Sequence, residues 1–127
     1  MKSVLLDTHA WAWTLTSDVR LSLRAVGAIN NADHVYLSPI SFFEIGQKLR
    51  LGKWDEMIPY ANDLVHIFEN QGGKIADLDA EICLSASRMD WIHRDPFDRL
   101  ICATAIKLNL PLISCDTIFD SIATRVW

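Results

Sequence analysis

The chain has 127 residues, half of them apolar, and a mass of 14.4 kDa, which suits one domain with a hydrophobic core. It has no apolar run near the ~20 residues of a membrane span, and an aspartate interrupts the N-terminal apolar stretch before a signal-peptide core is complete. We therefore expect a single cytoplasmic domain over residues 1–127 and no membrane contact. Three cysteines without a CxxC pair disfavour a disulfide framework or a zinc site and predict buried, reduced thiols.

The net charge of −4 comes from 12 lysines and arginines against 16 aspartates and glutamates. Taken alone, this balance disfavours a nucleic-acid-binding protein, because phosphate neutralisation supplies much of such affinity. The argument loses its force if four of the acids surround a cation, because the other 12 acids are then balanced by the 12 basic residues. The charge therefore decides neither for nor against a nucleic-acid partner.

Short apolar runs alternate with helical patterns along the chain. The apolar runs predict strands over residues 3–7, 34–39, 74–78 and 110–116, with an edge strand over 124–127. The helical patterns cover residues 8–15, 21–33, 41–52, 55–71, 79–90 and 96–109, with one or two further turns over 117–123. Strands separated by helices imply βαβ units and a mostly parallel sheet, whose ligand site lies at the carboxyl ends of the strands.

Four carboxylates are predicted at that edge of the sheet. Asp7 and Asp116 each follow a strand directly, and Glu44 and Asp98 lie about one turn into the helices that carry them. Oxygen ligands without a histidine or cysteine cluster suit Mg²⁺ or Mn²⁺ better than zinc. Ions of this kind activate water and stabilise a leaving oxygen in reactions of phosphates. The four acids together therefore predict a metal site for phosphate chemistry.

Each acid taken alone also fits a purely structural role. Ser41 and Glu44 have the spacing of a capping box, and Asp95 followed by Pro96 is typical of a helix start. Asp98 would then only interact favourably with the positive end of the helix dipole. Asp7 and Asp116 could cap the segments that follow their strands. The set favours a cation, because carboxylates that converge near a buried strand repel one another unless they are protonated or share an ion. We assign Asp95 to the cap and Asp98 to the metal.

Four segments carry a family pattern in a fixed order: LLDTHAWAW, SPISFFEIGQKLRLGK, HRDPFDRLICATAIKLNLPLISCD and IFD. With them the chain resembles the PIN-domain ribonucleases, and more narrowly the VapC-type toxins of bacterial toxin–antitoxin pairs. The resemblance covers nearly the whole chain, and DPFDRLICATA followed by PLISCD is its most specific part. It implies an α/β fold, a three-layer α/β/α sandwich around a mostly parallel central sheet.

The resemblance also implies a function and partners. A protein of this family hydrolyses RNA phosphodiester bonds as an endoribonuclease that depends on Mg²⁺ or Mn²⁺, with one or two ions in an acidic pocket. It acts as the toxin of a toxin–antitoxin pair, and family members are typically homodimers. A cognate antitoxin neutralises it by placing its tail in the active-site groove.

The family motifs assign roles by position. Thr8 and Ser114 occupy positions where the family often has hydroxyls beside the acids. Asp95 belongs to the DPFD variant and could orient a water there instead of only capping the helix. The catalytic and metal-binding acids, from the first to the fourth, are Asp7, Glu44, Asp98 and Asp116.

Basic and aromatic residues could hold the RNA. Arg99 follows a predicted metal ligand and is the strongest candidate for a phosphate contact, ahead of Arg94 and Lys48. A solvated helix face is the alternative for the lysine. Aromatic side chains could form core, stack on bases or bind a protein, since they serve all three roles. These side chains are Trp11, Trp13, Phe42, Phe43 and Trp54.

No histidine occupies a motif position that would make it an obvious general base. His9 is expected to pack beside Asp7, and His93 is expected in a solvated turn. The main alternative function is a catalytically inactive PIN-like module that binds RNA or protein, which the presence of all four acids disfavours. A haloacid-dehalogenase-type phosphatase is disfavoured, because it needs an aspartate where this chain has His9.

Overall fold

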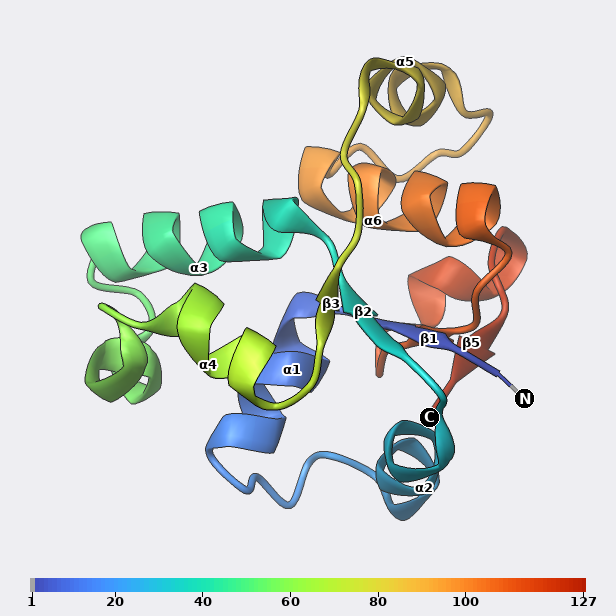
Figure 1. The fold of residues 1–127 in the computed structure, drawn as a ribbon. Helices are drawn as coiled ribbons and strands as arrows, with labels where there is room; N and C mark the ends of the chain where they lie inside the picture. Colours follow the sequence, from blue (N-terminus) through green and yellow to red (C-terminus); the bar gives the residue numbers. More distant parts are fainter. Residues whose placement is uncertain (1) are drawn as a thin grey trace.

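A computed structural model describes residues 2–127 and has a five-stranded sheet at its centre (Figure 1). The strand order is β3-β2-β1-β4-β5, and every neighbouring pair is parallel. The strands are β1 (Val4–Leu6), β2 (Val35–Leu37), β3 (Lys74–Ile75), β4 (Leu112–Ile113) and β5 (Arg125–Val126). The five predicted strands and the parallel α/β sheet are therefore confirmed, with β5 at an edge.

Helices connect the strands and lie on both sides of the sheet. They are α1 (Thr8–Leu15), α2 (Leu23–Asn31), α3 (Pro39–Arg50), α4 (Leu64–Asn70), α5 (Ala80–Arg88) and α6 (Pro96–Leu108), with 3-10 segments η1 (Asp55–Tyr60) and η2 (Thr117–Ser121). In Figure 1, α5 and α6 lie above the sheet and α1, α2 and α4 below it, while α3 contacts both α1 and α6. Within residues 2–127, no helix combines the length and apolar character needed to cross a membrane.

The central strand β1 shows how the layers are built. Its three residues are all buried, because helices cover both faces of the sheet. Val4 and Leu6 pack with α1, α2 and α4 around the fully buried Trp11. Leu5 faces the opposite side and packs against α6 through Ile101. This alternation gives the three-layer α/β/α sandwich that the resemblance implies.

Two departures from the predicted helix limits have clear physical causes. The pattern over residues 55–71 divides into η1 and α4, because Pro59 lacks the N–H that a continuous helix needs at that point. Helix α3 begins at Pro39, where the Ser38 hydroxyl caps it by accepting a hydrogen bond from the Ile40 N–H at 3.2 Å. The capping box that the spacing of Ser41 and Glu44 allowed as an alternative is therefore absent, and the glutamate lies in the second turn.

The cysteines are buried only in part. Cys102 lies inside the contact of α6 with the sheet, as predicted, whereas Cys83 and Cys115 are exposed. Cys83 belongs to α5, which rests on α6 and leaves its outer side to solvent (Figure 1). All three thiols are free. The prediction of buried thiols is therefore wrong for two of them.

Candidate active site

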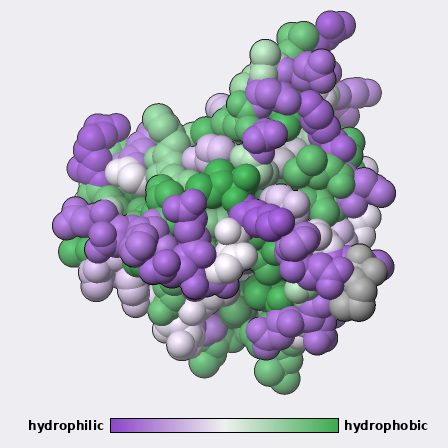
Figure 2. Space-filling model, in the orientation of Figure 1, coloured by the Kyte–Doolittle hydropathy of each residue, from purple (hydrophilic) through white to green (hydrophobic). Residues whose placement is uncertain are grey.

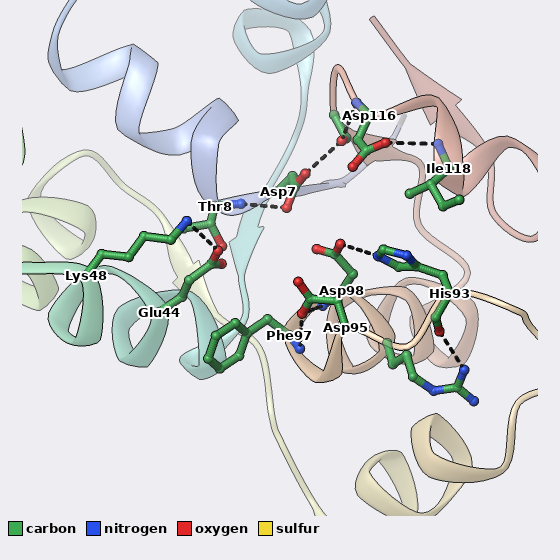
Figure 3. A network of polar contacts seen from close by, with 12 residues as sticks. Asp7, Thr8, Glu44, Lys48, His93, Asp95, Phe97, Asp98, Asp116 and Ile118 are labelled. Atoms are coloured by element: carbon green, nitrogen blue, oxygen red, sulfur yellow. Dashed lines mark hydrogen bonds and ion pairs between the residues drawn. The ribbon is translucent and has the colours of Figure 1, made fainter. Parts of the chain in front are cut away.

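The predicted acids meet at the carboxyl edge of the sheet. Asp7 follows β1 and Asp116 follows β4, while Glu44 comes from α3 and Asp98 from the first turn of α6. Figure 3 shows these side chains directed toward one common space, with Asp95 at its rim. The parallel topology produces this convergence, because the carboxyl ends of neighbouring strands open on the same side.

Asp7 is one of the two buried acids of the group. Its side chain is held at both oxygens: Oδ1 accepts a hydrogen bond from the Thr8 N–H at 2.9 Å, and Oδ2 accepts one from the Ser114 hydroxyl at 2.7 Å. Burial raises the pKa of Asp7 to about 6, against the lowering effect of the Ser114 bond and with a further rise from the charge of Asp98. Asp7 is therefore a carboxylate whose ionised form is disfavoured by its surroundings.

Two hydroxyls beside Asp7 have different partners. Ser114 is buried and joins two of the acids, since it donates to Asp7 and its oxygen accepts the Asp116 N–H at 3.0 Å. The Thr8 hydroxyl instead donates to the buried Ser41 oxygen at 2.8 Å, which links the start of α1 to α3. Ser114 thus contacts the acids directly, whereas Thr8 contacts Asp7 through its backbone.

Glu44 and Asp116 mark the two ends of the cluster. Glu44 is buried, and its Oε2 forms an ion pair with Lys48 one turn later in α3, at 3.1 Å. The Lys48 ammonium also lies 5.0 Å from the centre of the Trp54 ring. Asp116 is exposed, and its Oδ1 caps η2 by accepting the Ile118 N–H at 3.0 Å.

Asp98 and Asp95 occupy the start of α6 and have separate contacts. Asp95 is the N-cap, since its Oδ1 accepts the N–H groups of Phe97 at 2.8 Å and of Asp98 at 3.3 Å. Asp98 is turned toward Asp7, and burial, only partly opposed by a hydrogen bond with His93, raises its pKa. The cap geometry expected from the DPFD spacing is therefore present.

His93 was missed by the sequence analysis as a member of the site. Its Nε2 lies 2.7 Å from Asp98 Oδ2, and its side chain is 26% exposed. One donor atom from each of His93, Asp95 and Asp98 lies within 4.8 Å of the others. His93 sits in the loop before α6, where no periodicity indicates which way a side chain points. The only feature of the sequence that could have indicated this contact is the short separation of five residues between His93 and Asp98.

Arg99 has a different role from the one predicted. Its five N–H donors all meet backbone carbonyls of the last turn of α5 and of the loop between α5 and α6, so none is free for the predicted phosphate contact. The accepting oxygens belong to Ala86 (2.7 Å), Ser87 (3.5 Å), Met89 (2.6 Å), Trp91 (2.9 Å) and His93 (2.9 Å). Such a five-fold contact is a property of the planar guanidinium that periodicity does not reveal. Arg94 is exposed and directly precedes Asp95, and Lys48 pairs with Glu44.

The aromatic residues divide between core and surface. The three tryptophans of the predicted set are buried, and the His9 ring packs 4.6 Å from the Trp54 ring, which confirms a packing role for this histidine. Phe43 is 61% exposed and lies 5.9 Å from the Phe97 ring, between centroids. Figure 2 shows apolar side chains (green) in the region where α3 approaches α6. Phe43 is thus the aromatic residue available to a partner.

The donor set fits a hard divalent cation. Carboxylate oxygens dominate it, and burial, together with repulsion from other acids nearby, raises the pKa of both Asp7 and Asp98. A cation between these groups would offset that repulsion and favour their ionised forms. Asp7, Glu44 and Asp98 could hold it, with Asp116 at the margin. Among residues 2–127, the group whose ligand atoms already lie within 4.8 Å of one another is His93, Asp95 and Asp98.

Comparisons with known proteins agree with this geometry. A family model described as the PIN domain matches residues 4–125. The chain is 31% identical over 117 residues to ribonuclease VapC22 of Mycobacterium tuberculosis, covering 91% of this chain and 88% of that protein. Among solved structures, a toxin–antitoxin complex from Klebsiella pneumoniae aligns with a TM-score of 0.67 at 20% identity, over 98% of this chain and 96% of the other.

A second solved structure has the same fold. VapC20 of Mycobacterium tuberculosis, described as a toxin that cleaves the sarcin–ricin loop, aligns with a TM-score of 0.67 at 18% identity, over 93% of both chains. At such identities the structures support the fold alone, whereas the family model and the VapC22 identity define the family. The chain belongs to the PIN domain family and, within it, to the VapC ribonuclease toxins of toxin–antitoxin systems.

Proposed function

We propose that the acid cluster is the active site of a Mg²⁺- or Mn²⁺-dependent endoribonuclease, carried by one PIN-like domain over residues 1–127. The observation that carries the proposal is the convergence of Asp7, Glu44 and Asp98 at one edge of the sheet, two of them with raised pKa values. Buried acids in this arrangement are costly unless a cation or a proton shares them. Family membership supports RNA as the substrate.

The residues of this chain perform the positioning. The three acids would hold one or two ions, with Asp116 and its partner Ser114 at the outer side. A divalent ion supplies a bound water of lowered pKa and stabilises the leaving oxygen of a phosphodiester. Asp7 and Asp98 keep the frame rigid, since both are hydrogen-bonded on fixed elements. No side chain has to act as a nucleophile.

RNA contacts are proposed on the rim of the cluster. Arg94 is exposed and directly precedes Asp95, and Lys48 pairs with Glu44, so each cation neighbours one of the acids along the chain or in space. Phe43 presents an exposed ring for stacking on a base. The local positive charges would offset the repulsion between an acidic protein and phosphate.

The proposed partners are a cognate antitoxin and a second copy of the chain. The fold is shared with the toxin–antitoxin complex from Klebsiella pneumoniae, and the family is that of toxins. The exposed apolar side chains between α3 and α6 (Figure 2) are compatible with a protein partner. Light scattering of the purified chain tests for the homodimer, with a doubled mass as the expected result.

Cleavage of RNA by the purified protein tests the function. We expect cleavage with Mg²⁺ or Mn²⁺, none with EDTA, and a loss on the order of 100-fold or more in an Asp98→Asn variant. Asp95→Asn is the matched control, because an asparagine preserves the helix cap and removes the same charge one turn earlier.

The results for these variants distinguish a metal ligand from a helix cap, and an enzyme from a binding module. Equal loss in both variants, with both folded, would place Asp95 among the metal ligands. Binding of RNA without cleavage of any substrate tested would instead support the inactive PIN-like module.

A further inference from the structure

The contact between His93 and Asp98 is the shortest link between the acid cluster and the loop that precedes α6. Nε2 of the ring lies 2.7 Å from Oδ2 of the carboxylate. An ionised carboxylate only accepts hydrogen bonds, so Nε2 carries the hydrogen and donates it. With Oδ2 engaged in this way, Oδ1 is the oxygen of Asp98 left for a cation. Figure 3 shows the ring on the side of Asp98 that faces away from Glu44.

The loop holds the His93 ring in place by two further contacts. The backbone carbonyl of His93 accepts a hydrogen bond from Arg99 Nη1 at 2.9 Å, and the same nitrogen binds the Trp91 carbonyl. The ring of Trp91 lies 5.1 Å from the imidazole and 5.6 Å from the buried Phe119, between centroids. Backbone and ring are therefore both fixed from the protein side, so the imidazole has little freedom to leave the carboxylate.

We propose that His93 is a positioning residue of the active site, which orients Asp98 by donating a hydrogen bond to Oδ2 and thereby sets the affinity of the cluster for its divalent cation. The inference rests on the proposed function, since it assigns Asp98 to the metal. Groups that hold a ligating carboxylate from behind commonly change metal affinity or activity 10–100-fold when removed. His93 would do so without contacting RNA or the ion.

Three variants test this role by Mn²⁺ titration, with free Mn²⁺ followed by electron paramagnetic resonance. His93→Ala is expected to weaken Mn²⁺ binding by about tenfold. His93→Gln is expected to stay within about threefold of the natural protein, because its amide N–H can donate to the same oxygen. His66→Ala is the control, since His66 is exposed on α4 and bonds only to Asn70 among the described contacts.

Kinetics on RNA give a second readout. For His93→Ala we expect a reduced kcat with the KM for RNA within about twofold, because the change acts on the cation and not on RNA binding. Circular dichroism and thermal unfolding check that each variant is folded, as expected from the backbone contacts of His93, which alanine retains.

Several results would overturn the proposal. Unchanged Mn²⁺ affinity in a folded His93→Ala variant would show that Asp98 needs no such partner. A His93→Gln variant as impaired as His93→Ala would show that the imidazole itself acts, as a ligand or in proton transfer. Absence of RNA cleavage by the natural protein would count against the proposed function alone, because the Mn²⁺ titration still tests His93.

Discussion

Asp7 and Asp98 are neighbouring carboxylates held by two different kinds of structure. Asp7 is fixed by the sheet: its N–H donates to the Ile113 carbonyl on β4, and its side chain is bonded by groups at the ends of β1 and β4. Asp98 depends on His93, which belongs to a loop held by Arg99. One half of the site is therefore a consequence of topology, and the other half depends on a local loop.

The two halves also differ in electrostatics. The partners of Asp7 are a backbone N–H and a hydroxyl, which are neutral, so burial dominates and the pKa rises to about 6. Asp98 has an imidazole beside it, which opposes the effect of burial on its pKa. Substitutions on the sheet side should therefore change the charge and the pKa values of the acid cluster. Substitutions on the loop side should instead change how the Asp98 side chain is oriented.

The largest effect is expected from Asp7→Asn, which removes the charge on the sheet side and preserves the shape. RNA cleavage should fall by on the order of 100-fold or more, since a metal-binding carboxylate should matter more than a group that only holds one. Without metal, the variant should be more stable at pH 7.5, by up to about 3 kcal/mol, because burying the ionised carboxylate costs free energy. Urea unfolding in EDTA measures this difference.

The contribution of Asp7 to the free energy of unfolding should depend on pH, and the pKa of Asp7 gives the direction. The pKa of Asp7 is about 6 in the folded protein and 3.8 when unperturbed, so the folded state binds more protons between these values. Its contribution to the free energy of unfolding is present below pH 4 and is lost as the pH rises through 6. The gain of Asp7→Asn should accordingly vanish near pH 4. A gain that did not change with pH would contradict the burial argument.

On the loop side, the substitution expected to disrupt most contacts is at Arg99. Arg99→Gln leaves most of five carbonyls without their donor and should lower the free energy of unfolding by about 2–3 kcal/mol. Arg94→Gln is the matched control, because Arg94 is exposed and its loss should change stability by less than about 0.5 kcal/mol.

The variants Arg99→Gln and Arg94→Gln also distinguish a structural arginine from one that contacts RNA. In filter binding with a catalytically blocked protein, Arg94→Gln should weaken RNA affinity and reduce its salt dependence. Arg99→Gln should leave that salt dependence unchanged. The opposite result would restore Arg99 as the phosphate contact that its position in the sequence suggests.

The smallest effect is expected at the cap of α6. Asp95→Ala removes the acceptor for two N–H groups and should cost about 1 kcal/mol in urea unfolding, whereas Asp95→Asn should cost only a few tenths. RNA cleavage by Asp95→Asn should remain within about threefold of the natural protein. A much larger loss of activity would mean that the loop side contributes a second charge to the site.

The sequence predicts the sheet side of the site better than the loop side. Asp7 and Asp116 follow buried apolar runs, and parallel topology alone brings such positions together. Arg99 and His93 have partners that come from the loop, and their directions depend on a chain path without periodicity. Ser41 shows the same limit: its spacing from Glu44 suggested a cap, but the helix begins earlier and the hydroxyl binds Thr8.

The five contacts of Arg99 have a consequence for how RNAs would be told apart. They tie the segment from Ala86 to His93 to one rigid group, so the cost of ordering this rim is met during folding and not during binding. A rim of this kind does not remodel itself around a poorly matching RNA. Selectivity on this side of the site would then come from rejecting strands of the wrong shape, not from adapting to the right one.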